Sequence, residues 1–99
     1  MASGTPGPRL LVRAAQAGDA QLVARLLGEG RDVNEADEFG CTALILASLN
    51  GHVEVVRHLL ARKGVEVNKN AADGSTALMV ASQYGHIEVV RLLDRKSVV

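Results

Sequence analysis

Histidine is the side chain in this sequence best suited to metal binding or proton transfer, and two of the three histidines recur in the same context. His52 and His86 each follow a glycine and lie 34 residues apart. A closed zinc site needs about four ligands from adjacent elements, and one cysteine with three separated histidines does not supply them. We therefore predict no metal site, and we assign both rings to hydrogen bonds with the backbone where a helix begins.

The single cysteine, Cys41, is the only thiol that could act as a nucleophile. A reactive thiolate needs a neighbouring histidine or a cationic environment, and the sequence places neither beside Cys41. The pattern Gly28-Glu29-Gly30 follows a predicted helix, whereas a dinucleotide-binding loop follows a strand. The sequence therefore predicts that the chain is not an enzyme and holds no cofactor.

Cys41 and His52 belong to a stretch that occurs twice, and His86 lies in its second copy. The segment from Gly40 to Leu59 returns from Gly74 to Leu93, and thirteen of the twenty aligned positions are identical. A period of about 33 residues is typical of solenoids built from stacked units. Such a unit cannot bury its own apolar face, so it needs neighbours on which to pack.

Each copy divides into two short segments at an internal glycine. The first, from Thr42 to Asn50, is a mostly apolar run, and periodicity alone would allow either a buried strand or a buried helix. Thr42 as an N-cap and Gly51 as a left-handed terminal residue favour a helix. The second segment, from Val53 to Arg62, places its apolar residues along one stripe. We therefore expect two short antiparallel helices in each unit.

The repeated residues resemble the ankyrin repeat. Both copies read Gly-x-Thr-Ala-Leu and then Ala-Ser-x-x-Gly-His-x-Glu-Val-Val-Arg-x-Leu, and Asn68 lies eight residues past Leu60. The resemblance covers residues 37–70 as nearly a whole repeat, residues 71–93 as most of another and residues 4–36 more loosely. It implies an all-α solenoid of stacked helix-turn-helix pairs joined by hairpin-like finger loops.

The domain organisation follows from this resemblance. Residues 1–8 are rich in glycine, proline and small polar side chains, so we expect a flexible leader there. The repeat domain should occupy residues 9–99, with repeats at about 4–36, 37–70 and 71–99. Both clear copies depart from the family pattern, because Ala43 and Ala77 replace a proline and Ile45 and Met79 replace a histidine. That histidine bonds the threonine hydroxyl in the family, so this bond is lost while the threonine can still cap.

The first repeat should contain helices over residues 9–17 and 20–27, with the Asp19 carboxylate capping the second. It lacks the segment that opens the other two repeats. Four polar residues can face the side without a neighbour, as an end repeat requires: Arg9, Arg13, Gln16 and Arg25.

The connecting segments carry further predictions. Asn34 and Asn68 should bond loop backbone, as short amides do at turns. One extra residue near Lys63 should be a surface insertion. The segment 29–38 carries five acidic residues and one arginine, which could favour a basic partner, although a solvated loop is the ordinary alternative.

The third repeat departs from the pattern at its end. Asp94 occupies the slot that Leu60 holds in the second repeat, and Ile87, Val98 and Val99 leave apolar surface without an obvious cover. We expect either a fragment of a longer array or a last helix that frays.

Composition narrows the functional classes. The formal net charge is zero, which argues against a general nucleic-acid binder or an anionic-membrane binder. No apolar run approaches the roughly 20 residues of a membrane span, and the N-terminus shows no basic and apolar leader. One cysteine allows no intramolecular disulfide, which suits a reducing compartment. We therefore expect a cytoplasmic or nuclear protein.

In proteins of the resembled family, finger tips and the exposed side of each first helix line a concave face that binds a partner. Carried over to this sequence, the resemblance implies a partner-binding set with members from both clear repeats. The chain's only aromatic residues, one phenylalanine and one tyrosine, both fall in it. The alternative is that Phe39 folds back over a finger and Tyr84 packs against a neighbouring helix. The set comprises Glu38, Phe39, Cys41, Leu49, Asn50, Ala72, Asp73, Ser75, Gln83 and Tyr84.

Three functional classes follow. We expect a module that binds another protein, of unknown identity, through the concave face. The alternative is a structural tile that docks on further repeats or on itself through its C-terminal side. An enzyme or a nucleic-acid binder is the third class, and nothing in the sequence supports it. We expect a monomer, with self-association through the C-terminal side as the exception.

Overall fold

The computed structural model describes residues 9–97. The predicted leader at 1–8 and the apolar residues Val98 and Val99 lie outside the described residues. Within 9–97 the chain forms six helices and one isolated antiparallel bridge, between Ala36 and Thr42, which confirms the all-α prediction. The helices are α1 (Leu10–Ala17), α2 (Ala20–Gly28), α3 (Ala43–Leu49), α4 (Val53–Leu60), α5 (Ala77–Gln83) and α6 (Ile87–Ser97).

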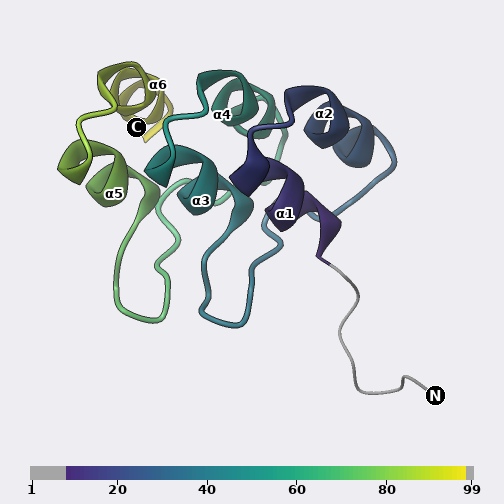
Figure 1. Ribbon diagram of the computed structural model, residues 1–99, viewed down its shortest axis with the longest axis horizontal. Coiled ribbons are helices and arrows are strands. Elements are labelled where there is room, and N and C mark those ends of the chain that lie inside the picture. The colour runs from purple at the N-terminus through teal and green to yellow at the C-terminus, as the bar shows by residue number, and fades with distance from the viewer. Residues whose placement is uncertain (1–8, 98–99) are drawn as a thin grey trace.

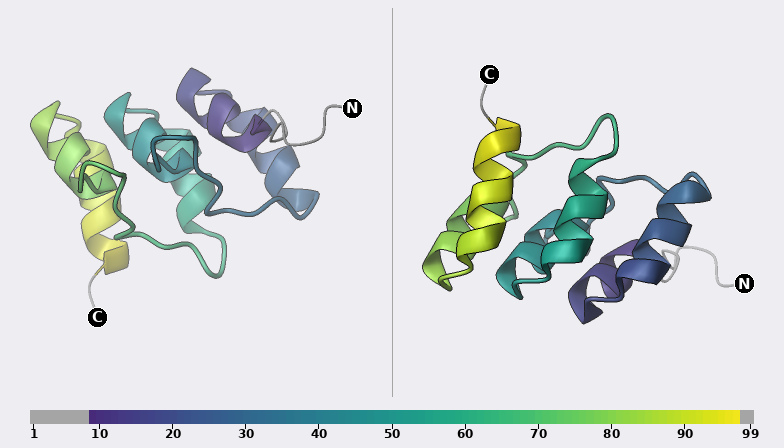
Figure 2. Two further views of the ribbon diagram at one scale, coloured as in Figure 1. Left: turned by 90° about the horizontal axis from the view of Figure 1, so that it is seen from below. Right: turned by 90° about the horizontal axis from the view of Figure 1, so that it is seen from above.

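The helices form two layers. The first helix of each pair (α1, α3, α5) lies in one row and the second (α2, α4, α6) in the other, with two finger loops extending from the first row (Figure 1). Each helix contacts its partner in the pair and the equivalent helix of the next pair. Figure 2 shows the three pairs side by side in both turned views. The molecule is therefore a short stack of equivalent units, as the repeat predicts.

Local side-chain caps mark where three helices begin, α2, α3 and α5. The hydroxyl of Thr42 accepts a hydrogen bond from the Ile45 backbone N–H at 3.1 Å, and Thr76 does the same for Met79 at 3.2 Å. Such a bond satisfies one of the amides that a helix leaves unpaired in its first turn. The carboxylate of Asp19 caps α2 in the same way. All three predicted caps are confirmed.

Helix α1 has a different cap. Arg9 occupies the N-cap position in a left-handed conformation, with φ 51°, and its side chain makes no capping bond. Instead Oε2 of Glu35 accepts a hydrogen bond from the Val12 backbone N–H at 3.2 Å. Val12 is the third residue of α1, the same position that Thr42 and Thr76 satisfy in α3 and α5. A carboxylate distant in sequence thus replaces the missing threonine.

A glycine–histidine contact repeats between the units. The ring of His52 lies over Gly18, where a Cβ would come within 2.7 Å, and the ring of His86 lies over Gly51. Nε2 of His52 donates to the Gln16 carbonyl at 3.0 Å, and Nε2 of His86 donates to the Leu49 carbonyl at 2.9 Å. The predicted backbone bonds of both rings are confirmed, and each one joins a repeat to the one before it.

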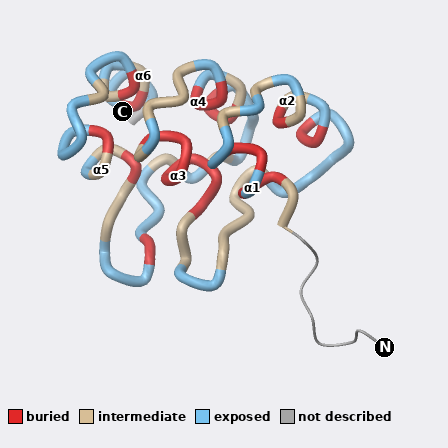
Figure 3. The backbone as a smooth tube through the Cα atoms, in the orientation of Figure 1, coloured by how far each residue is buried: buried red, intermediate tan, exposed pale blue. Residues whose placement is uncertain are grey.

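The core runs through the stack. Figure 3 shows the buried backbone along the facing sides of the helices, and exposed residues at the finger tips. Every residue of α3 except Leu49 is buried, because this helix has neighbours on both sides. The largest fully buried side chains come from all three repeats: Leu11, Val23, Val55, Val56, Leu59, Val89 and Leu93.

Two polar side chains connect neighbouring repeats. Nδ2 of Asn34 donates to the Gly64 carbonyl, and its Oδ1 accepts from the Glu66 amide, both at 2.8 Å. Nη2 of Arg62 donates to the Leu27 carbonyl, also at 2.8 Å. The prediction for Asn34 is confirmed, and the inserted residue near Lys63 lies in an exposed turn.

Some predicted details differ from the structure. Helix α1 begins at Leu10 and α4 ends at Leu60, one and two residues inside the predicted bounds, while α2 extends to Gly28. Arg9 does not lie on an open polar face, because its guanidinium pairs with Glu38 at 3.0 Å. An ion pair between residues so far apart in the sequence cannot be predicted from the local sequence pattern.

Candidate partner-binding face

The first finger ends in a turn that holds Phe39 outward. Oδ1 of Asp37 accepts hydrogen bonds from the backbone N–H groups of Phe39 and Cys41, each at 2.9 Å. The Asp37 amide in turn donates to the Cys41 carbonyl at 3.0 Å. Gly40 provides the left-handed residue of this turn, with φ 77°. With its backbone fixed in this way, the Phe39 side chain is 65% exposed.

The second finger repeats the backbone turn, but its aspartate, Asp73, stands at the position of Phe39, and Ala71 stands at that of Asp37. Oδ1 of Asp73 accepts from the Ser75 amide at 2.9 Å, and the Ala71 amide donates to the Ser75 carbonyl at 2.8 Å. Hydrogen bonds from the Ser75 backbone and hydroxyl favour the charged carboxylate and lower the pKa of Asp73 below its usual value. The tip therefore presents a negative charge at neutral pH.

A backbone hydrogen bond joins the two fingers. The Ala72 amide donates to the Phe39 carbonyl at 2.9 Å. Ala72 N would lie 3.1 Å from a Cβ at position 40, so glycine there permits the close approach. The predicted members Glu38, Phe39 and Cys41 are thus brought together with Ala72, Asp73 and Ser75 in one finger-tip group.

The remaining predicted residues form a second group at the ends of α3 and α5. Asn50 follows α3, is exposed, and donates through Nδ2 to the Leu46 carbonyl at 3.0 Å. Tyr84 caps α5 and is 58% exposed. Leu49 is half-buried and Gln83 is exposed. Since a seven-residue helix spans about 10 Å, the two groups lie at opposite ends of α3 and α5, the finger tips before each helix and the second group where it ends.

The two aromatic side chains do not follow the alternative in which they are covered by the protein itself. Both Phe39 and Tyr84 expose more than half of their surface, as do Met79 and Ile87 elsewhere. Among the described residues these four are the exposed large apolar side chains. The assignment of Phe39 and Tyr84 to a binding face stays a prediction.

Sequence reasoning missed one residue at this face. Arg9 reaches from the start of α1 to Glu38 at the first finger tip, and its side chain is largely buried while that of Glu38 is exposed. The opposite charges were visible in the sequence, but the first repeat lacks the threonine that would have fixed the start of its helix.

The Cys41 environment suits a structural thiol. Partial burial disfavours the thiolate, and the carboxylates of Asp37 and Asp73 add negative charge nearby, so the pKa of Cys41 lies above its ordinary value. A thiol with a raised pKa is a poor nucleophile at neutral pH.

Within residues 9–97 no three histidine, cysteine or acidic side chains cluster closely enough to hold a metal ion. None of the helices described there has the length and apolar character needed to cross a membrane.

Known proteins show where similar repeats occur. A family model for ankyrin repeats, in three copies, matches residues 11–97. Human mitochondrial disaggregase is 49% identical over 51 residues, which cover 52% of this chain and 7% of that protein. Zebrafish (Danio rerio) ankyrin repeat domain-containing protein 29 is 46% identical over 57 residues, covering 57% of this chain and 19% of that protein.

A third relative extends the same pattern. Cortactin-binding protein 2 of Dasypus novemcinctus is 46% identical over 57 residues, covering 57% of this chain and 3% of that protein. The chain therefore matches less than a fifth of the length of each of these relatives.

Proposed function

The chain belongs to the ankyrin-repeat family, and from this premise we propose that it binds another protein through the finger-tip group and the exposed ends of α3 and α5. Repeats of this family are generally protein-interaction modules. The observation that supports this face is the exposure of Phe39 and Tyr84, at 65% and 58%. Aromatic side chains are preferred anchors of protein interfaces.

The fingers present a preformed surface. Each tip is fixed by an aspartate that bonds backbone amides, and the Ala72–Phe39 bond holds one finger against the other. A surface that is already ordered loses little conformational entropy on binding. The charge of the tips favours a partner with basic groups beside an apolar contact, because Asp73 is ionised and exposed.

The test is a capture experiment with matched variants. The chain and a Phe39→Ala/Tyr84→Ala variant are immobilised, and proteins retained from a lysate are identified by mass spectrometry. An Ile87→Ala variant is the control, because Ile87 is equally exposed, at 67%, but lies on α6 in the other layer. A protein held by the chain and the control but lost by the double variant supports the proposal. Retention of the same proteins by all three would contradict it.

A second candidate function is docking on a further repeat. In the slot of Ile45, which is 3% exposed, the third repeat carries Met79 at 56%. Gly18 and Gly51 are each covered by a histidine ring, whereas a Cβ at Gly85 would meet nothing within 4 Å. In the first and second repeats this side is covered by the following repeat. The third repeat exposes the equivalent side.

The covering unit would need a histidine at the start of its second helix. The first repeat of this chain has Asp19 at that position, so a head-to-tail dimer would not reproduce the contact. Appending a copy of residues 66–97, which keeps the 34-residue period after Val99, should raise the free energy of unfolding, and changing the copied His86 to alanine should remove part of the gain. No gain would exclude this function, and association of the unextended chain at rising concentration would indicate self-docking instead.

Location in the cell is a further part of the proposal. One cysteine allows no intramolecular disulfide, which fits the cytoplasm or nucleus. Imaging of the full protein tagged with a fluorescent label would decide between these compartments and another.

A further inference from the structure

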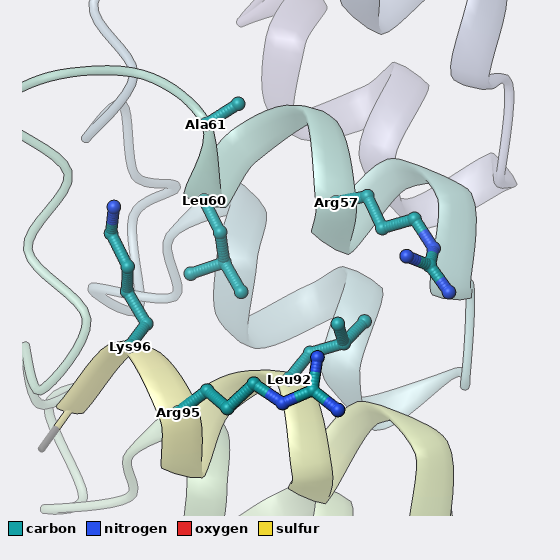
Figure 4. Close-up of a pocket in the computed structure, with 6 residues that line it drawn as sticks. All are labelled: Arg57, Leu60, Ala61, Leu92, Arg95 and Lys96. Carbon is teal, nitrogen blue, oxygen red and sulfur yellow. The ribbon is translucent and has the colours of Figure 1, made fainter.

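The second-helix layer contains an apolar groove with cationic edges. It lies between α4 and α6, has a volume of about 360 Å³, and is lined by Leu60, Leu92, Ala61, Arg57, Arg95 and Lys96. Figure 4 shows Leu60 and Leu92 projecting into the space between the two helices, with Lys96 toward one end and Arg57 toward the other. This groove is on the layer away from the fingers (Figure 1).

The apolar floor is specific to this pair of helices. Leu92 occupies the slot that His58 holds in the second repeat, so the third repeat replaces an imidazole with an aliphatic side chain. Leu92 is only half-buried, and Leu60 opposite it is 7% exposed. Leu92 packs against the core with part of its side chain, and the part that stays exposed lines the groove.

A side-chain bond crosses at the equivalent place between α2 and α4. There Arg62 donates to the Leu27 carbonyl at 2.8 Å. Lys96 stands at the position aligned with Arg62, and Leu60 at the position aligned with Leu27. Within residues 9–97 no hydrogen bond or ion pair holds Lys96 in that way. The Lys96 end of the groove between α4 and α6 therefore lacks the bond that crosses between α2 and α4.

The cations at the two ends differ in their pairing. Arg57 lies 3.4 Å from Glu54 and 3.8 Å from Glu88, so nearby carboxylates offset its charge. Arg95 and Lys96 have no such carboxylate partner among the described residues. Cations in the last turn of a helix interact favourably with the helix dipole, by about 0.3–1 kcal/mol. This interaction accounts for Arg95 and Lys96 but not for Leu92 beside them. The groove thus combines apolar surface with two positive charges, Lys96 at one end and Arg95 beside Leu92, that no described carboxylate pairs (Figure 4).

We propose that this groove binds an acidic peptide segment carrying a large apolar side chain. The apolar side chain lies on Leu60 and Leu92, and flanking carboxylates lie against Arg95 and Lys96. An anionic membrane fits less well, because Glu54 and Glu88 carry negative charge at the other end of the groove and the chain has no net charge. The site is separate from the finger face, so it allows a second contact with one partner or a second partner.

Synthetic peptides of about ten residues test this directly. The first probe carries leucines along one face of a helix, with glutamates beside them. A second probe replaces each glutamate with lysine, and a third replaces each leucine with alanine. Fluorescence anisotropy measures affinity, and amide chemical shifts of the protein locate the contact. We expect binding of the first probe only, weakened by salt, with shifts confined to α4 and α6.

Variants of the protein link binding to the groove. Arg95→Glu/Lys96→Glu should weaken the first probe by about tenfold or more, and Arg95→Gln/Lys96→Gln, which keeps good helix formers, should weaken it less. Leu92→His, the residue of the second repeat at this slot, should weaken it severalfold. Arg91→Glu is the control on the same helix outside the groove and should change affinity by less than about twofold.

Four outcomes would overturn the proposal. These are equal binding of the lysine probe, no binding at millimolar peptide, an effect of Arg91→Glu as large as that of the groove variants, or shifts located at the fingers. Phosphatidylserine vesicles provide the remaining comparison. If the vesicles bind more tightly than the glutamate probe and depend on the same residues, the groove is a membrane contact and the peptide proposal is wrong.

Discussion

The ring of His86 lies directly against Gly51, so that a Cβ at position 51 would come within 2.5 Å of Nδ1. Gly51 also has a positive φ of 71°. The same backbone conformation occurs at Gly85, φ 73°, where no atom lies within 4 Å of the added Cβ. These two glycines therefore separate the cost of backbone strain from the cost of the contact between repeats.

Alanine at these glycines should be unequally tolerated. Gly85→Ala should lower the free energy of unfolding by about 1–2 kcal/mol, the cost of a left-handed alanine. Gly51→Ala should cost about 1–3 kcal/mol more, because the His86 ring must also move. Urea denaturation measures both. In a His86→Ala background the two substitutions should cost nearly the same, and a difference that persists there would show that the ring is not the cause.

Removing the carboxylate that caps α1 should destabilise the first repeat. Glu35→Ala leaves the Val12 amide without its 3.2 Å partner, and loss of an N-terminal cap costs about 1 kcal/mol. Glu35→Gln keeps an acceptor oxygen and should cost less. Glu66→Ala, at an exposed glutamate, is the control. Amide hydrogen exchange at Val12 and urea denaturation measure the effect. Unchanged exchange at Val12 in Glu35→Ala would mean that the Glu35 carboxylate does not stabilise α1.

Alkylation of Cys41 should be slow and sensitive to Asp73. Burial and two carboxylates raise the pKa of the thiol, so less thiolate is present at a given pH than in an unfolded chain. Asp73→Asn removes one negative charge and should lower that pKa, which speeds the reaction with iodoacetamide below the midpoint of the thiol's titration. The rate is followed against pH in folded protein. A slower reaction in Asp73→Asn would reverse the expected sign.

The cost of replacing a large apolar residue by alanine should depend on how exposed its side chain is. Leu44 is 2% exposed, and Leu44→Ala should cost about 2–5 kcal/mol. Phe39→Ala and Tyr84→Ala should each cost less than about 0.5 kcal/mol, as exposed positions usually do. Thermal and urea denaturation compare the three. If Tyr84→Ala unfolded the protein, Tyr84 would be a packing residue and its place in the binding face would be lost.

Replacing a buried hydroxyl should not weaken the fold. Ser48 is fully buried, and its Oγ has no hydrogen-bond partner among the described residues. The first repeat fills the aligned slot with Ala15, also fully buried. Ser48→Ala should therefore leave the free energy of unfolding unchanged or raise it by about 1 kcal/mol. A loss of about 1 kcal/mol or more in urea denaturation would show that a water molecule or an alternative rotamer satisfies the hydroxyl.

The parts of the fold that could be predicted are those specified by neighbouring residues. Thr42 caps a helix three residues on, Gly51 ends one, and an aspartate turns each finger, and all of these depend on atoms within a few positions. Because the same local signals occur twice at one period, the stacking followed as well. Most helix bounds were correct to within two residues for this reason.

Contacts between distant residues could not be predicted in the same way. The Glu35 cap, the Arg9 ion pair and the Arg62 bond join residues 23 to 35 positions apart. Each depends on the path of a loop, and several other charged residues had equal claim from the sequence. For the same reason the sequence identified both groups of the candidate face but not their separation along α3 and α5.

Among the described residues, the hydrogen bonds that link the repeats through side chains span 29 to 37 residues. Each repeat is therefore held by its immediate neighbour and by no longer-range tie of this kind. Under a pulling force applied to the two ends, tension would reach each interface in series. The molecule would extend in steps of one repeat, and it would behave as a spring whose units open and close one at a time.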